Sequence, residues 1–221
     1  MIGTIPTLIT AIAAITVPFI TFFLGRVNEN YKTRLEYRTF LLIDEIKGQY
    51  HLKNALVKAG SKLLLPKSYE SLENFISWKK LDRDPNFTDV NKFNYLQIKS
   101  LGKSIIIGGF IKITLDNDEE TLIETVLPLL EPNGEVYVPL DVNYGNVSGK
   151  PYGVKKIWIE YQLQTGQKMK FVSKRNFKKE QTVVKDSYWI KRFHLKYFRI
   201  HNLKSKNASW YYLNLNKEKI N

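Results

Sequence analysis

Apolar residues fill the first part of the chain without interruption, and charged residues begin only at Arg26. The uncharged run over residues 2–25 has 24 residues. As an α-helix it would span about 36 Å, more than the roughly 30 Å of a bilayer's hydrocarbon core. A transmembrane helix is therefore predicted over residues 1–25, with a buried helix of a soluble domain as the alternative. No basic residue precedes the run and no small-residue cleavage site follows it, so we expect it to be retained.

The charges that flank this run predict its orientation. Basic residues follow it closely, at Arg26, Lys32, Arg34 and Arg38, whereas only the α-amino group precedes it. Cytoplasmic flanks of membrane helices are enriched in lysine and arginine. We therefore expect the N-terminus to lie outside the membrane and the C-terminal domain to lie in the cytoplasm.

Helical spacing of apolar residues continues beyond the first charge. The positions concerned are Tyr31, Leu35, Leu42 and Ile46. They predict a juxtamembrane helical region over 26–80, which includes a short helix in SYESLENFISW. The stripe has to pack against something, either the soluble domain or, in a homo-oligomer through 26–60, another copy of the chain. Charged and turn-forming residues then predict a linker over 81–92.

The pattern changes to a period of two beyond the linker, as strands require. Gly108 and Gly109 interrupt one apolar run and predict a bulge. Two turn signals predict hairpins: Asn133-Gly134 and Thr165-Gly166. The alternation before the second signal places apolar side chains on one face: Ile157, Ile159, Tyr161 and Leu163. The fold class is therefore predicted as α+β, with an antiparallel β-sandwich or barrel over 93–221.

Several of these stretches resemble a known group of proteins. The segments YLQIKSLGKSIIIGGFIKI, LEPNGEVYVPL and IWIEYQLQTGQKMKF are similar to those of poorly characterised bacterial single-pass membrane proteins with a cytosolic immunoglobulin-like β-sandwich. LLIDEIKGQYHLKNAL resembles the juxtamembrane helix that often precedes that domain. Ser100 and Asn133 depart from the usual Asn and Pro. The resemblance implies an immunoglobulin-like fold and a location in the bacterial inner membrane, and it implies no activity.

Most of the formal net charge of +13 lies in one segment. Residues 168–206 contain thirteen Lys and Arg against two acidic residues, whereas residues 104–167 contain four lysines against nine acidic residues. This basic segment is also rich in aromatic residues. It is interpreted either as ordinary solvated sheet surface or as a site for anionic lipid or nucleic acid. The candidate binding residues are Lys174, Arg175, Lys178, Lys179, Lys191, Arg192, Lys196 and Arg199.

Catalytic and metal-binding signals are weak. The chain has no cysteine, which excludes disulfides, thiolate catalysis and cysteine-ligated metals. Its three histidines are His51, His194 and His201, and no pair of carboxylates lies close to them in sequence. LGKS lacks the preceding glycine of a phosphate-binding loop. We therefore expect no enzyme activity and no cofactor.

Two functions remain after these exclusions. The first is a membrane-anchored, non-enzymatic binding module whose basic face contacts anionic lipid or an acidic partner. The alternative is a membrane effector of bacterial or phage-related defence. In such an effector the cytosolic domain senses a nucleotide or a phage component, and the N-terminal helices oligomerise to damage the membrane.

Overall fold

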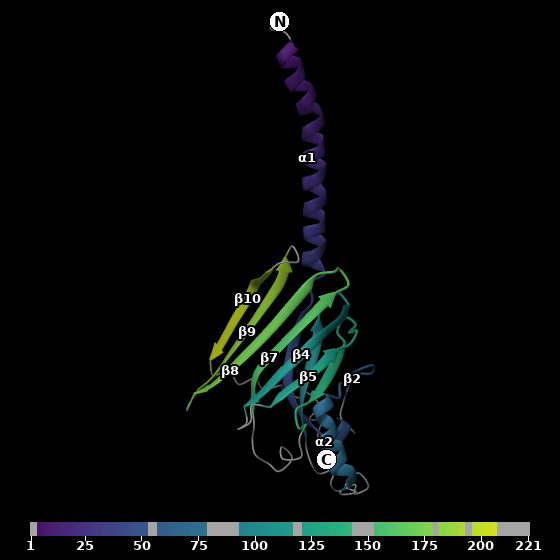
Figure 1. Ribbon diagram of the computed structural model, residues 1–221, viewed down its shortest axis with the longest axis vertical. Helices are drawn as coiled ribbons and strands as arrows, with labels where there is room; N and C mark the ends of the chain where they lie inside the picture. The colour runs from purple at the N-terminus through teal and green to yellow at the C-terminus, as the bar shows by residue number, and fades with distance from the viewer. Residues whose placement is uncertain are drawn as a thin grey trace, which may run out of the picture.

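The computed structural model describes residues 4–52, 57–78, 93–116, 121–142, 153–178, 181–192 and 196–206. Helix α1 (Thr4–Glu36) projects from one end of a β-rich body (Figure 1). It has 33 residues, and a helix of that length extends about 50 Å. Large apolar side chains on it face outward, with Phe19 71% and Ile15 74% exposed. α1 is therefore long and apolar enough to cross a membrane.

The predicted helical region over 26–80 is wrong beyond the end of α1. Residues Phe40–Gly48 form strand β1, which pairs along its length with β3 (Phe93–Leu101). Leu42, on the predicted helical stripe, is 39% exposed, whereas Leu41, which lies off that stripe, is 3% exposed. Pairing with β3 determines the structure of these residues. The helical spacing is coincidental, because Tyr31 and Leu35 lie on α1 whereas Leu42 and Ile46 lie on β1. Only residues 26–36 of the predicted stripe are helical, in α1, and a homo-oligomer through 26–60 stays a prediction.

Within the described residues beyond β1, helical structure returns in short pieces. Turns η1 (Tyr50–Leu52) and η2 (Lys67–Tyr69) are 3-10 helices. Helix α2 (Glu70–Trp78) confirms the short helix predicted from SYESLENFISW and buries Leu72 completely. The predicted linker over 81–92 lies outside the described residues.

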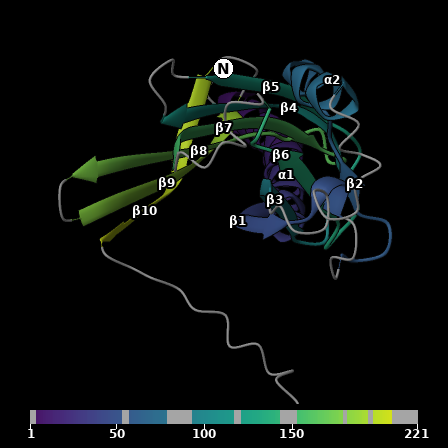
Figure 2. The same cartoon turned by 90° about the horizontal axis from the view of Figure 1, so that it is seen from below.

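The remaining strands build two sheets. They are β2 (Lys62–Leu63), β4 (Ile106–Asp116), β5 (Leu122–Leu127), β6 (Glu135–Pro139), β7 (Gly153–Leu163), β8 (Lys168–Lys178), β9 (Gln181–Arg192) and β10 (Lys196–Lys206). The strand orders are β1-β3-β6-β2 and β10-β9-β8-β7-β4-β5. Among the described strands only β2 and β6 pair in parallel. The view from below shows the sheets as two layers (Figure 2). An apolar helix followed by a mostly antiparallel β region agrees with the α+β class.

The predicted turns have different outcomes. Thr165 and Gly166 do join a hairpin of β7 and β8, with Gly166 at φ 74° and the Leu163 amide donating to Gln167 O at 2.9 Å. The hairpin predicted at Asn133-Gly134 is wrong. There β5 pairs with β4, and β6 pairs with β3 and β2, so the turn carries the chain from one sheet to the other. A turn signal specifies local backbone, with Asn133 at φ 57°, but not which strands pair.

The predicted bulge near Gly108 and Gly109 is confirmed by a register shift between Ile106 and Gly108. Gly109 also permits close packing of strands, because a Cβ there would lie 2.3 Å from Glu160 O. This approach keeps β4 and β7 paired beyond the bulge.

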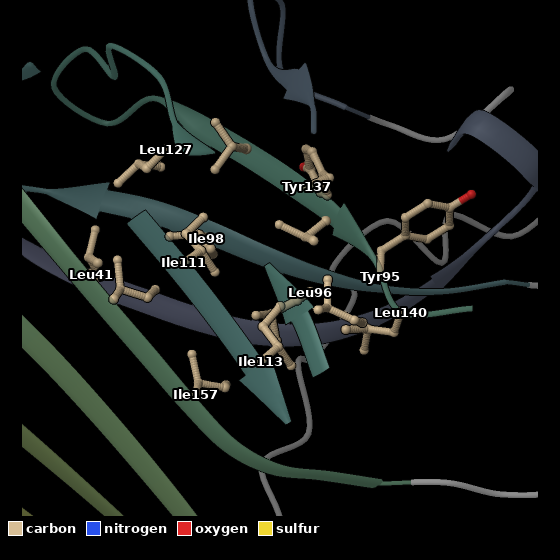
Figure 3. Close-up of a cluster of buried hydrophobic side chains, with 14 of the residues drawn as sticks. Leu41, Tyr95, Leu96, Ile98, Ile111, Ile113, Leu127, Tyr137, Leu140 and Ile157 are labelled. Carbon is tan, nitrogen blue, oxygen red and sulfur yellow. The ribbon is translucent and has the colours of Figure 1, made fainter. Parts of the chain in front are cut away.

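One hydrophobic core lies between the two sheets. Leu41 of β1, Ile98 of β3, Ile111 and Ile113 of β4, and Ile157 of β7 are labelled members of it (Figure 3). The predicted inward face of β7 is confirmed, since its four apolar residues are all at most 3% exposed. The sheets therefore fix one another, and the basic strands β8, β9 and β10 lie in the six-stranded sheet.

Candidate binding surface

Strands β8, β9 and β10 carry the basic segment, and alternation divides its side chains between two faces. Met169 and Phe171 of β8 are buried opposite Ile190 and Tyr188 of β9. Successive strand residues point to opposite faces. The even-numbered residues of β8, such as Lys174, therefore lie on the outer face, away from the core.

Four lysines occupy one row of register positions across β7, β8, β9 and β10, here called the lysine row. In order across the sheet they are Lys156 of β7, Lys174 of β8, Lys185 of β9 and Lys204 of β10, each opposite the next. The first three are exposed. Neighbouring strands are about 4.8 Å apart, so the row is about 14 Å long. Because like charges directly opposite destabilise a sheet, an extended anion laid along the row would relieve that repulsion.

A second row further along the same sheet is different, because its charges and rings engage one another. Arg199, Trp189, Lys170 and Glu160 lie opposite one another in turn. Lys170 Nζ lies 5.3 Å from the ring centre of Trp189 and 4.3 Å from that of Tyr197. The Arg199 guanidinium also lies over the Trp189 ring, 4.7 Å from its centre. Burial and the neighbouring Glu160 carboxylate raise the pKa of Tyr197 to about 12. The cations and aromatic rings of this row therefore stabilise one another.

A cleft of about 530 Å³ opens where α1 meets the body, here called the basal cleft. Its walls come from the last turns of α1, from the β7–β8 turn and from the end of β9. The charged residues that line it are all basic: Arg34, Arg38, Lys168 and Lys191. Tyr31 adds an aromatic ring. The cleft is thus a concave, cationic site built from three separate parts of the chain.

Buried hydrogen bonds hold α1 in place beside this cleft. The Tyr161 hydroxyl donates to Thr39 O at 2.8 Å. Thr39 Oγ1 donates to Ser104 O at 3.0 Å and accepts from the Ser104 amide at 3.2 Å. Gly102 is required here, because a Cβ would lie 2.6 Å from Thr39 Oγ1. Burial raises the pKa of Tyr161 well above its ordinary value, so the hydroxyl keeps its proton. The junction fixes one wall of the basal cleft.

The eight predicted binding residues do not share one surface. Lys174 belongs to the lysine row and Lys191 lines the basal cleft. Arg199 packs over Trp189. Arg175 lies on the inner face and forms an ion pair with Glu45 of β1, so its role is structural.

The other four predicted residues lie at the ends of the strands. Arg192 and Lys196 are opposite each other where β9 passes into β10. Lys178 is opposite Gln181 at the far end of the β8–β9 hairpin. Lys179 lies outside the described residues.

Sequence reasoning missed the partners that complete each site. Lys156 was counted with the acidic stretch 104–167, and only the register of β7 against β8 brings it beside Lys174. In the sequence, Arg34 and Arg38 indicate only the orientation of the apolar helix. The alternation in VKKIWIEY does place Lys156 and Ile157 on opposite faces of the strand, so the outward direction of Lys156 is predictable from the sequence.

The histidines are widely separated. His51 Nε2 lies 3.5 Å from Glu73 Oε1, and the His201 ring lies 6.2 Å from that of Tyr188. His194 lies outside the described residues. Within the described ranges, no group of three or more His, Cys, Asp or Glu side chains is placed to hold a metal ion.

Comparisons with protein families, with curated proteins and with solved structures found no match. The resemblance to membrane-anchored immunoglobulin-like proteins therefore stays a prediction.

Proposed function

We propose that this protein is a membrane-anchored, non-enzymatic binding module whose lysine row binds an acidic partner protein. α1 serves as the anchor in the bacterial inner membrane, with the N-terminus outside and the β-rich body in the cytoplasm. The lysine row carries the proposal, because the exposed and opposed Lys156, Lys174 and Lys185 cost stability unless an anion offsets their repulsion.

The position of the row favours a soluble partner over lipid. Lys185 lies six residues along β9 from Lys191, which is about 20 Å of strand. The head-group layer of a bilayer is only about 5–8 Å deep. The row therefore stands too far from the membrane for lipid to reach it.

The chemistry of the row favours an acidic protein over nucleic acid. Its cations are lysines, which attract anions as point charges and do not read bases in the bidentate way of arginine. Single-stranded nucleic acid also needs free aromatic faces for stacking. The nearest ring on the same face, that of Trp158, packs edge-on against Phe110. The rings of Trp189 and Tyr197, further along, are already covered by Lys170.

We also propose that the body is an immunoglobulin-like sandwich. The order β1-β3-β6 corresponds to strands A, B and E of that fold, and β8-β7-β4-β5 corresponds to G, F, C and C′. On this assignment β9 and β10 are additions beyond strand G. They enlarge the outer face and complete the lysine row.

Binding of poly-glutamate to the full chain in phosphatidylcholine nanodiscs, across a salt series, tests the function. We expect salt-sensitive binding that the double variant Lys174→Gln/Lys185→Gln weakens at least about tenfold. The matched control is Lys168→Gln/Lys191→Gln, which removes the same charge from the same strands and should bind as the parent does.

Absence of binding by the parent at low salt, or equal loss in both variants, would contradict the proposal. Tighter binding of mixed-sequence DNA than of poly-glutamate would replace the protein partner by nucleic acid.

A further inference from the structure

We infer that the basal cleft binds the phosphate-bearing head group of one anionic phospholipid. This inference rests on the proposed anchoring, because it requires α1 to span the membrane. It concerns a different surface from the lysine row and a different class of ligand.

The depth of the cleft matches the head-group layer. Its wall on α1 begins at Val27, directly after the first charged residue, Arg26. Since the uncharged run fills the hydrocarbon core, Val27 and the turn that follows it lie among the head groups. Side chains on a helix tilt toward its N-terminus. The membrane lies on that side of Arg34, so its guanidinium is directed back toward the lipid.

The charge of the cleft matches a phosphate. Arg34 comes from α1, Arg38 follows it, and Lys168 and Lys191 come from β8 and β9, so four cations meet around one hollow. The nearby acidic residue Glu36 is engaged by Lys103 at 3.0 Å. Arginine binds phosphate through paired hydrogen bonds, and lysine adds point charge. A volume of about 530 Å³ lies in the range of small-ligand sites.

The structure at the base of α1 supports a lipid rather than a free ion. Tyr31 lies on the cleft wall and is 50% exposed. Tyrosine, with an apolar ring and a polar tip, is enriched at the membrane interface. Figure 1 shows β7, β8 and β9 reaching the end of the body from which α1 projects, so the cleft opens beside the anchor. A lipid beside α1 would present its phosphate to the cleft while its acyl chains stayed in the bilayer.

Native mass spectrometry of the full chain, released from nanodiscs of phosphatidylcholine with minor phosphatidylglycerol, tests the inference. We expect one phosphatidylglycerol to be retained per chain, and the variant Lys168→Gln/Lys191→Gln to retain it roughly thirtyfold less. Lys174→Gln/Lys185→Gln, with the same charge change on the same strands, should retain it like the parent. A parallel arm with inorganic phosphate should not displace the lipid.

Hydrogen exchange gives an independent readout. Phosphatidylglycerol should slow exchange in the β7–β8 turn, and phosphatidylcholine alone should not. Equal retention by both double variants, or equal exchange in both lipids, would overturn the inference. Alkali extraction of membranes separates this failure from failure of the anchor. A chain that is extracted contradicts the proposed anchoring, whereas an inserted chain without lipid preference contradicts only the cleft.

Discussion

The basal cleft and the lysine row both contain lysines of β8 and β9, yet the fold builds the two regions in different ways. The cleft joins α1 to β8 and β9, and buried hydrogen bonds around Thr39 fix its walls. The row depends only on the register of neighbouring strands. One lies beside the anchor and the other lies about 20 Å further along the sheet. The net charge of a segment therefore does not define a site, because position along the strand decides which anion can reach it.

Reversing the charge of the row should have the largest effect. In Lys174→Glu/Lys185→Glu the acidic probe would meet like charge, which costs several kcal/mol. We expect poly-glutamate binding to fall at least about a hundredfold, with retention of phosphatidylglycerol unchanged. Titration of the same preparation with both ligands measures the two effects. Parallel loss of both would mean that the two regions act as one surface.

Crowding the junction of α1 should damage the cleft and spare the row. In Gly102→Ala the new Cβ would lie 2.8 Å from Thr39 Cα and 2.9 Å from Arg38 O. We expect a loss of about 1–3 kcal/mol in the free energy of unfolding, with reduced lipid retention. Urea denaturation and native mass spectrometry provide the measurements. Unchanged stability would show that the junction is looser than its contacts indicate.

A milder change at the same junction tests whether the cleft is coupled to it. Tyr161→Phe leaves Thr39 O without the hydroxyl that donates to it at 2.8 Å. A buried acceptor left unsatisfied costs about 1–3 kcal/mol. The variant should unfold at lower urea concentration and retain less phosphatidylglycerol, while still binding poly-glutamate. Tyr197→Phe, on the outer face, is the matched control and should keep its lipid.

Neutralising one lysine of the row should have the smallest effect, and this effect should be an increase in the free energy of unfolding. Lys185→Gln removes repulsion from Lys174, the exposed lysine opposite it on β8. We expect the free energy of unfolding to rise by about 0.2–1 kcal/mol, most of it at low salt. Lys112→Gln, which breaks a pair with Glu124 on the same face, should not stabilise. A destabilised Lys185→Gln would remove the argument that the row awaits an anion.

Sequence patterns predicted local structure better than long-range pairing. The long apolar run, the Thr165-Gly166 hairpin and the inward face of β7 follow from spacing and turn chemistry, so they were predictable. β1 was missed because its identity depends on pairing with β3, fifty residues away in sequence. The crossing at Asn133-Gly134 was missed because a turn does not specify its strands.

The candidate site was predictable in residue type but not in arrangement. The excess of lysine and arginine over 168–206 identified the region. The separation of Arg175 onto the inner face, where it pairs with Glu45, needed the opposite sheet. The inclusion of Lys156 and Arg34 needed the register and the placement of α1. Both depend on contacts between residues far apart in sequence.

Measuring how far the basal cleft and the lysine row lie from the membrane tests the central claim most directly. The chain has no cysteine, so Gln164→Cys at the β7–β8 turn and Lys185→Cys in the row can each carry one fluorophore. In the full chain reconstituted in liposomes, lipids with a quencher on the head group should quench the probe at residue 164 strongly. They should leave the probe at residue 185 nearly unquenched. Equal quenching at both positions, or stronger quenching at 185, would contradict a cleft that faces the membrane and a row that faces the cytoplasm.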